Sequence, residues 1–370
     1  MSAAPLTGLR VVEFTHMVMG PAAGAILASL GAEVVRVEPE GGDPTRRLIG
    51  SGAGYFPMYN RHKASVCLDL KSPEGLAHAR RLAGEADILI ENFRPGALDR
   101  LGLGYDALAA DNPRLIYCSL KGFLPGPYQH RTALDEVAQM MGGLAYMTGP
   151  PGRPLRAGAS VIDVTGGMFG VIAILAAIEE RHRTGRGQRV QASLFETTAY
   201  LVGQHMAQKA VTGQAAAPMP ARISAWAIYD VFETQDEPVF VGVVSDSQWE
   251  SFCRLFALDA LWADEGLRRN NDRVRARDRI LPEIRALFGA MTQGEIVAKL
   301  ERSGLPFAPI ARPEDLFEDA HLLASGGLEP VTLPDGTQTS LPTLPVAFGT
   351  ERPGRPAVLP EPGADQDKLN

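Results

Sequence analysis

The sequence is poor in cysteine and lacks metal-binding patterns. Its three cysteines, Cys67, Cys118 and Cys253, include no Cys-x-x-Cys pair, and two of them lie in apolar, strand-like runs. Such usage predicts buried, reduced thiols in a cytoplasmic protein. The seven histidines show no spacing that is typical of a metal site. We therefore expect a protein that binds no metal.

The short motifs of several enzyme classes are also missing. No Gly-x-x-x-x-Gly-Lys-Ser/Thr loop occurs, which argues against phosphoryl transfer by a P-loop. The near match to Gly-x-Gly-x-x-Gly at residues 102–107 follows a helical stretch and not a strand, so a dinucleotide site is not expected. Residues 158–162 lack the last glycine of a Gly-x-Ser-x-Gly nucleophile elbow.

Charge and hydropathy exclude two kinds of partner. The net charge is −7, and no long run of lysine and arginine occurs, which argues against nucleic acid. The longest apolar run, Gly166–Ile178, is too short to span a bilayer. The first residues lack the basic and apolar regions of a signal peptide. We expect no membrane partner and a cytoplasmic location.

The first 200 residues alternate between short β-branched runs and helical patterns. Helices are expected at residues 21–31, with proline in the first turn, and at 72–83, with serine as the cap. This alternation predicts an α/β, Rossmann-like domain with a mostly parallel sheet. The expected strands are 9–14, 33–38, 65–70, 87–91, 115–120 and 189–193.

The length of 370 residues predicts two domains. Residues 1–211 would form the large domain, and the Ala-, Pro- and Gly-rich stretch 212–224 a linker. Residues 225–325 would form a smaller α+β domain, which contains an antiparallel pair of strands at 225–232 and 238–244. The Pro-rich tail, 326–370, would return to the large domain.

Asp163 is the most informative acidic residue. It lies where an apolar run turns into a small-residue helix start, with a long apolar helix behind it. At or near the N-cap it would face free N–H donors and the positive end of the helix dipole. These keep a carboxylate ionised, as a carboxylate nucleophile requires. Because aspartate is also a common helix cap, the position alone favours a structural role over a catalytic one.

Several phrases of the sequence together resemble one enzyme family, the class III CoA-transferases. The most specific phrase is Arg-His-Arg-Thr-Gly-Arg-Gly-Gln-Arg-Val-Gln-Ala-Ser-Leu at 181–194. The resemblance runs in order from about residue 6 to residue 200. The family includes formyl-CoA:oxalate and carnitine CoA-transferases and the α-methylacyl-CoA racemases. The other phrases stand at residues 8–21, 30–46, 60–71 and 91–103.

The resemblance implies an interlocked homodimer that binds coenzyme A on the large domain. It also implies that Asp163 attacks the acyl-CoA thioester to form an acyl–aspartyl anhydride, followed by an aspartyl–CoA thioester. These steps need neither ATP nor a metal. Gly166 and Gly167 would offer backbone N–H groups to developing negative charge.

The racemase branch of the family differs at one position. Racemases pair the aspartate with a histidine, but the aligned phrase at 133–139 carries Leu134 at that place, and leucine cannot exchange a proton. This departure argues against racemisation. Asp135 is either an auxiliary site residue or a structural one. A racemase or epimerase, and a non-catalytic CoA-binding protein, are the alternatives to a transferase.

The resemblance also indicates candidate binding residues. Arg46, Arg100 and Lys121 would contact the phosphates of CoA, although each could equally be a surface cation. His16 and Val18 would lie near the reacting centre. Formyl-CoA transferases carry glutamine where Val18 stands, which argues against formyl-CoA:oxalate exchange. A short dicarboxylate such as succinate, mesaconate, itaconate or citramalate is the expected acid, with Arg222 as its carboxylate clamp.

Overall fold

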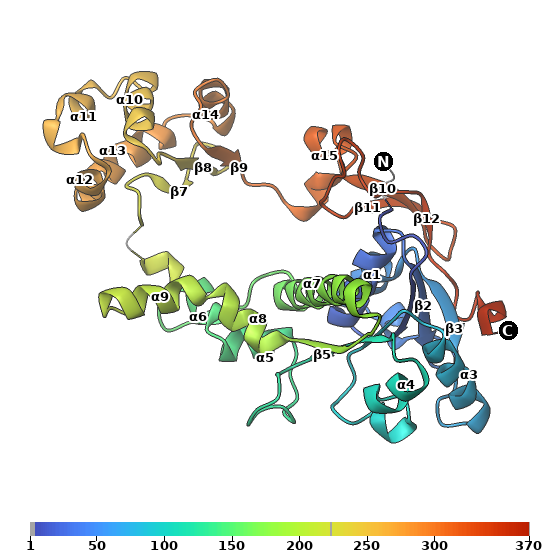
Figure 1. Ribbon diagram of the computed structural model, residues 1–370. Helices are drawn as coiled ribbons and strands as arrows, with labels where there is room; N and C mark the ends of the chain where they lie inside the picture. Colours follow the sequence, from blue (N-terminus) through green and yellow to red (C-terminus); the bar gives the residue numbers. More distant parts are fainter. Residues whose placement is uncertain (1–3, 223, 370) are drawn as a thin grey trace. The chain divides into compact units, whose positions relative to one another are not determined.

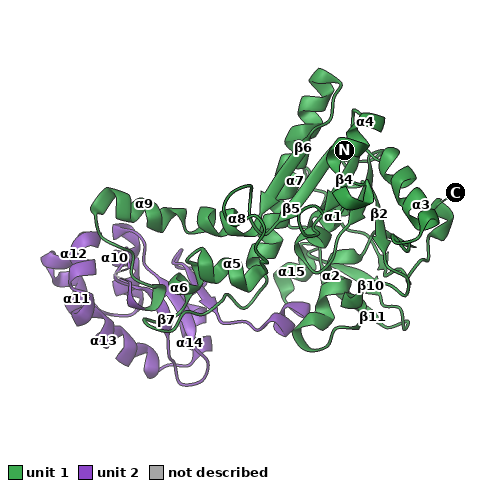
Figure 2. Ribbon diagram, turned by 90° about the horizontal axis from the view of Figure 1, so that it is seen from below, with its two compact units in different colours: residues 1–220, 319–370 green, residues 221–318 purple. Residues whose placement is uncertain are grey.

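The computed structural model describes residues 4–222 and 224–369. The chain forms two compact units, which are coloured separately in Figure 2. The first contains residues up to 220 together with the tail from 319, and the second contains residues 221–318. The second unit thus begins and ends a few residues before the boundaries at 225 and 325 that the composition indicates.

The first unit contains a six-stranded sheet with the order β3-β2-β1-β4-β5-β6, and all its pairings are parallel. The expected α/β fold with a parallel sheet is confirmed. The strand order reverses between β1 and β4, and this is where such sheets open a ligand crevice beyond the carboxyl ends of their strands. The strands are β1 (Arg10–Phe14), β2 (Glu33–Glu38), β3 (Ala64–Cys67), β4 (Ile88–Glu91), β5 (Ile116–Lys121) and β6 (Arg189–Ser193).

Helices cover both faces of this sheet (Figure 1). Helices α1 (Met19–Ser29) and α7 (Val161–Thr184) lie on one face, while α3 (Pro73–Gly84) and α4 (Tyr105–Asp111) lie on the other. Successive strand residues point to opposite faces of the sheet. Because helices cover both faces, the side chains on both faces must be apolar. Val11 packs in the cluster with α1 and α7, and its neighbour Val12 packs in the cluster with α3 and α4.

Helix α7 is longer than the apolar run in the sequence indicates. At 24 residues it is long and apolar enough, by length and composition alone, to cross a membrane. It packs along α1 and over β5 and β6, which is the place of a core helix. The expectation that no stretch reaches membrane-spanning length is therefore wrong for the helix, because helical structure continues beyond residues 166–178 in both directions.

Smaller elements complete the first unit, and its tail is tied to the sheet. The side chain of Gln366 donates to the Cys67 carbonyl oxygen and accepts from the Cys67 N–H. The tail strands are β10 (Leu328–Thr332), β11 (Gln338–Pro342) and β12 (Ala357–Val358), preceded by α15 (Ala320–Ala324). The remaining helices are α2 (Tyr55–Asn60), α5 (Asp135–Met141), α6 (Leu144–Thr148), α8 (Leu194–Leu201) and α9 (Gly203–Thr212).

The second unit has its own core. Its antiparallel strands β7 (Tyr229–Phe232), β8 (Val239–Gly242) and β9 (Phe307–Pro309) pack against helices around the buried side chains of Trp249, Phe252 and Phe288. The helices are α10 (Asp246–Leu255), α11 (Asp259–Ala263), α12 (Asn270–Arg275), α13 (Arg277–Gly289) and α14 (Gln293–Leu300).

Candidate active site

A cavity of about 710 Å³ lies beyond the carboxyl ends of β1, β4 and β5. This is the point at which the strand order reverses, where ligands of such sheets bind. The loops that follow these three strands line it, together with the start of α5 and the first turn of α7. His16, Val18, Arg100, Asp135 and Asp163 all line this cavity, which is formed by residues of the first unit.

The loops that follow β1 and β4 are joined by a reciprocal pair of hydrogen bonds. The His16 N–H donates to Asn92 Oδ1 over 2.9 Å, and Asn92 Nδ2 donates to the His16 carbonyl oxygen over 2.8 Å. The ring of Phe93 lies 5.5 Å from that of His16. Met17, which follows His16 in this loop, has a φ of 62°, a left-handed conformation that costs a non-glycine residue about 1 kcal/mol. Asn92 thus holds a strained loop in place.

A buried ionic cluster lies beneath the loop after β1. Glu13 is fully buried and accepts hydrogen bonds of 2.9 Å from both Lys63 and Arg36. Lys63 also donates to the Pro21 carbonyl oxygen at the start of α1 over 2.8 Å. Burial lowers the pKa of Lys63 to about 8, and the charge of Glu13 partly offsets this. The cluster therefore fixes β1, its loop and α1 relative to one another.

Asp163 lies in the first turn of α7, but Asp135 takes the N–H donors of that turn. Asp135 Oδ2 accepts from the N–H groups of Ile162, over 2.8 Å, and Asp163, over 3.0 Å. Its Oδ1 accepts from Gln139 Nε2 over 2.5 Å. The expectation that the helix N-terminus serves the Asp163 carboxylate is therefore corrected, because a neighbouring carboxylate occupies those donors.

This arrangement changes the acidity of Asp163. Burial raises its pKa from 3.8 to about 7, the negative charge of Asp135 adds to the increase, and Arg156 opposes it. The sequence predicts a readily ionised carboxylate, but in the structure Asp163 ionises near neutral pH. A carboxyl group with a raised pKa gives a more basic carboxylate, and this basicity favours nucleophilic attack once the proton is lost.

Gly166 and Gly167 have a different role from the one expected. Both are buried inside α7, where N–H groups donate to carbonyls one turn earlier and are not free for a substrate. A Cβ added at Gly166 would lie 2.7 Å from Met19 Cε, and one at Gly167 would lie 2.8 Å from the Met19 carbonyl oxygen. The glycines therefore allow α7 to approach the start of α1.

Of the predicted CoA-binding cations, Arg100 and Lys121 line the cavity and Arg46 does not. Arg46 donates to Glu38 over 2.6 and 2.8 Å and to the Pro360 carbonyl oxygen over 2.7 Å. Its guanidinium also lies over the ring of Phe56. All three of its nitrogens thus serve the protein itself, and Arg46 ties the tail to β2. Arg222 belongs to the second unit.

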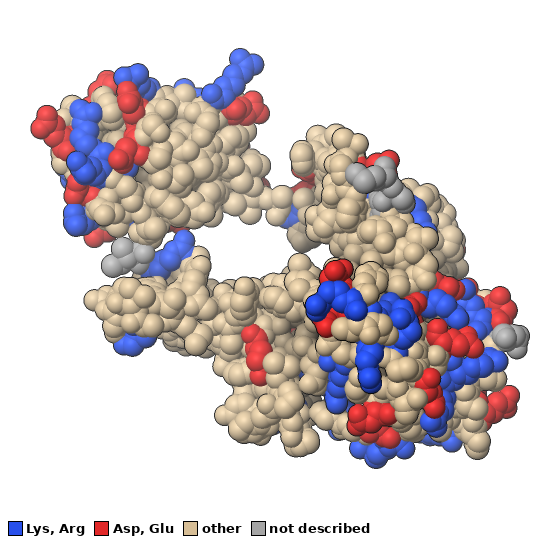
Figure 3. Space-filling model, in the orientation of Figure 1, with Lys and Arg blue, Asp and Glu red and all other residues tan. Residues whose placement is uncertain are grey.

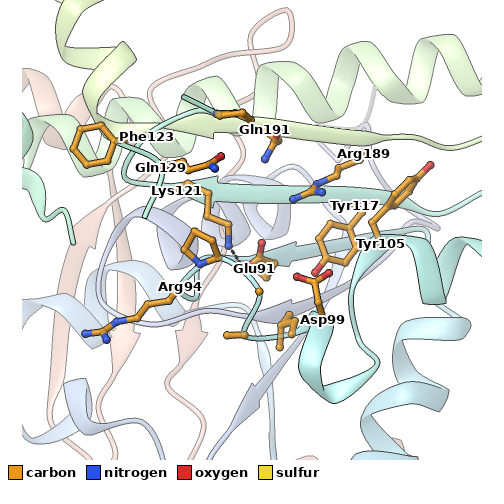
Figure 4. A pocket seen from close by; sticks show the side chains of 15 residues that line it. Glu91, Arg94, Asp99, Tyr105, Tyr117, Lys121, Phe123, Gln129, Arg189 and Gln191 are labelled. Atoms are coloured by element: carbon orange, nitrogen blue, oxygen red, sulfur yellow. Dashed lines mark hydrogen bonds and ion pairs between the residues drawn. The ribbon is translucent and has the colours of Figure 1, made fainter. Parts of the chain in front are cut away.

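Lys121 also borders a smaller cavity of about 200 Å³ (Figure 4). Its Nζ donates to Glu91 Oε2 and to the Phe93 carbonyl oxygen, each over 2.6 Å. Glu91 Oε2 in turn accepts from the Phe93 N–H over 3.1 Å. The pair therefore fixes the backbone of the loop after β4, whose Asn92 holds His16.

The cavity contains residues that the sequence did not single out. Arg156, Tyr55 and Asn92 all line it. Asn92 stands within one of the phrases that carry the resemblance, whereas Arg156 and Tyr55 lie outside all of them, and no spacing in the sequence marks the three as cavity residues. Leu134, at the place of the racemase histidine, also lines the cavity. Among the described residues, no group of three or more His, Cys, Asp or Glu side chains could hold a metal ion.

Comparison with known proteins identifies the family. The sequence model described as CoA-transferase family III matches residues 6–366. A succinate–glutarate CoA-transferase of Agrobacterium fabrum is 34% identical, with 90% of this chain and 86% of that protein covered. An acetyl-CoA:oxalate CoA-transferase of Acetobacter aceti is also 34% identical, covering 97% and 94%.

A solved structure agrees over the whole length. A CAIB/BAIF family protein from Brucella suis is 31% identical, with a TM-score of 0.85 and all of both chains covered. The order of the sheet, the acid at the start of α7 and these matches lead to one conclusion. This chain belongs to the class III CoA-transferases and is an enzyme of that class.

Proposed function

We propose that this enzyme moves CoA between an acyl-CoA thioester and a carboxylic acid, with Asp163 as the nucleophile. The observation that carries the proposal is the position of Asp163. It is a largely buried carboxyl group in a cavity at the carboxyl edge of the sheet, with a pKa of about 7. At that pKa much of the group is ionised at neutral pH, and the ionised form is basic enough to attack a thioester.

The exchange would proceed through covalent steps that balance without ATP. An Asp163 oxygen attacks the thioester carbonyl carbon, the C–S bond breaks, and CoA thiolate leaves an acyl–aspartyl anhydride. The thiolate then attacks the aspartyl carbonyl carbon and releases the donor acid, which leaves an aspartyl–CoA thioester. The acceptor carboxylate attacks the aspartyl–CoA thioester and displaces CoA thiolate, which gives a second anhydride. The thiolate then attacks the acyl carbon of the acceptor, releases the Asp163 carboxylate and departs as the new acyl-CoA. Each step exchanges one activated acyl group for another.

The names of the relatives favour a dicarboxylic acid as one substrate. Succinate, glutarate and oxalate, which occur in the names of the Agrobacterium and Acetobacter proteins, are all diacids. For this chain we propose a short diacid, such as succinate, mesaconate, itaconate or citramalate. CoA would lie across the loops after β1 and β4, with Arg100 as a candidate phosphate contact.

Covalent trapping tests the nucleophile. Incubation with succinyl-CoA, acetyl-CoA or another acyl-CoA followed by hydroxylamine should modify Asp163, as read by peptide mass spectrometry. Asp163→Asn should abolish both the label and CoA exchange. Asp106→Asn removes another first-turn helix aspartate, which is exposed and outside the cavity, and should leave exchange unchanged. Full exchange by Asp163→Asn would refute the nucleophile.

Two further measurements separate the alternatives. Deuterium incorporation at Cα of an acyl-CoA without an acceptor acid would indicate a racemase or epimerase. CoA binding by calorimetry without exchange across a broad panel of acids would indicate a binding protein. Leu134 in the cavity, where racemases carry histidine, favours the transferase.

We also propose that the enzyme is an interlocked homodimer, in which a second copy covers an apolar surface formed by α7, α8 and α9. Met168 and Ile172 on α7, Tyr200 on α8 and Met206 on α9 are about half exposed or more. Figure 3 shows few charged side chains over α8 and α9. Apolar patches of this kind commonly mark a partner surface.

A cytoplasmic location, with no membrane or nucleic-acid partner, is part of the same proposal. Cys118 and Cys253 are buried free thiols. Burial raises the pKa of Cys253 to about 12, which suppresses thiolate chemistry. Fractionation of cells that express the tagged chain, with recovery in the soluble cytoplasmic fraction, is the test.

A further inference from the structure

Arg156 lies among the acidic side chains of the main cavity. Its Nη1 donates to Glu136 Oε1 over 2.5 Å, and its Nε donates to the Ala157 carbonyl oxygen over 3.0 Å. Asp135 and Asp163 line the same cavity. Within the part of the chain that the structure describes, Nη2 of Arg156 has no hydrogen-bond partner. One third of the side chain is exposed, so a ligand in the cavity can reach it.

The guanidinium is held in a fixed position relative to α7. Gln139 is fully buried and joins two parts of the site. Its Nε2 donates to Asp135, and its Oε1 accepts from the Ala157 N–H over 2.9 Å. Asp135 in turn accepts from the first N–H groups of α7. The backbone next to Arg156 is therefore tied to the same carboxylate that organises the Asp163 turn.

The charges of the site change during catalysis. Before reaction, the positive charge of Arg156 lowers the pKa of Asp163 and so favours its ionised form. Once Asp163 carries an acyl group or CoA, it has no negative charge. A diacid that enters then brings a second carboxylate close to Asp135 and Glu136, which repel it. An arginine with a free nitrogen is the group that can bind that carboxylate in a defined geometry.

We propose that Arg156 binds the far carboxylate of a dicarboxylic acid while the near carboxylate attacks the aspartyl–CoA thioester. This assignment rests on the proposed function, and it makes Arg156 the residue that selects diacids over monoacids. Arg222, the clamp expected from the sequence, is not required by it. Glu136 orients the arginine by occupying one of its nitrogens and leaves another for the substrate.

The test compares acceptors of equal chain length. With a covalent enzyme intermediate, kcat/KM for the acceptor depends only on the second half of the reaction, so any donor that labels Asp163 is suitable. We expect the wild type to prefer glutarate to valerate and succinate to butyrate. Arg156→Gln should lower these ratios about 10- to 100-fold through a higher KM for the diacids, since it removes a charged hydrogen bond.

Two variants sharpen the comparison. Arg156→Lys keeps the charge and loses the planar fork, so its ratio should fall between the wild type and Arg156→Gln. If Arg156→Gln does not fold, a lowered ratio in Arg156→Lys supports the assignment and an unchanged ratio overturns it. Arg131→Gln removes another cation of the same cavity, whose guanidinium lies over the ring of Tyr128, and should leave the ratios unchanged.

The outcomes separate this assignment from the proposed function. If no donor labels Asp163, the proposed function fails, and the assignment fails with it. If Asp163 is labelled but Arg156→Gln keeps the wild-type ratios, only the assignment is overturned. Equal use of monoacids and diacids by the wild type also overturns it.

Discussion

At the scale of single residues, Asp135 and Asp163 share one helix start but have different environments. Asp135 receives three hydrogen bonds from N–H donors, which stabilise a negative charge. Asp163 is left with burial and a like charge beside it, and both raise its pKa. The distribution of donors therefore gives the two acids different environments, as is common in active sites.

The raised pKa of Asp163 predicts a pH dependence of catalysis. The rate of enzyme acylation should increase with pH and level off above about 7, since only the carboxylate attacks. Rapid-quench measurement of the covalent enzyme at fixed acyl-CoA checks this. In Asp135→Asn the negative charge beside Asp163 is removed, so the rising part of the pH–rate profile should move to lower pH. An acylation rate that does not change between pH 5 and pH 8 would contradict it.

The same pKa difference is expected to appear in stability. The folded pKa of Asp163 lies above the value of 3.8 for a free side chain, so folding takes up a proton between these two values. The stabilising effect of that proton is complete below about pH 4 and is lost as pH rises through about 7. Asp163→Asn avoids this loss, so its advantage over the wild type in urea unfolding should grow across that range, to at most a few kcal/mol.

At the scale of elements, the packing of α7 on α1 sets the position of the site. Met19 begins α1 at the end of the loop after β1, and it contacts α7 one turn beyond Asp163. Because both glycines of that turn lack side chains, the helix can approach this loop closely. The distance between His16 and Asp163 therefore depends on two residues that do not react.

Alanine substitutions test this contact. Gly167→Ala places a Cβ against the Met19 backbone oxygen, so we expect a loss of about 1–3 kcal/mol in urea unfolding and a higher KM for acyl-CoA. Gly166→Ala meets only the mobile end of the Met19 side chain, and its loss should be smaller. The exposed helix residue Gly294 has no atom within 4 Å of an added Cβ, so Gly294→Ala should be neutral or stabilising. Equal losses at 166 and 167 would contradict the argument.

Elements were easier to predict from the sequence than contacts. The strands at 33–38 and 189–193 agree with the structure at both ends, because their β-branched patterns are bounded by clear helix and turn signals. The resemblance indicated His16, Asp135 and Asp163, which the fold brings to one cavity. Arg156 was missed, since its pairing with Glu136 and its effect on Asp163 appear only when α5 and α7 meet. The predicted ready ionisation of Asp163 was wrong for the same reason, because the burial and the neighbouring charge of Asp135 that raise its pKa also depend on these contacts.

At the scale of the whole molecule, the first unit is assembled from both ends of the chain. The tail is attached to β2 through Arg46 and to β3 through Gln366. The intervening unit has its own core, and the chain passes into it and back out. In the proposed interlocked dimer, a second copy threaded between the outgoing and returning segments of this chain could not leave without partial unfolding.

An interlocked dimer predicts an unusual kinetic stability. Light scattering should give twice the chain mass of 39.7 kDa. Tagged and untagged dimers, when mixed, should not exchange subunits in native buffer over days, but should form mixed dimers after unfolding and refolding, because separation requires an open chain path. A carboxylate at Ile172, which is 58% exposed in the single chain, would be buried by the partner.

Ile172→Glu should therefore reduce the yield of dimer. Arg183→Glu, at an exposed position near the end of the same helix, should not. Free exchange of native subunits would contradict interlocking while leaving a simple dimer, and a mass of one chain would contradict both. In that case the apolar surface of α7, α8 and α9 would need another partner.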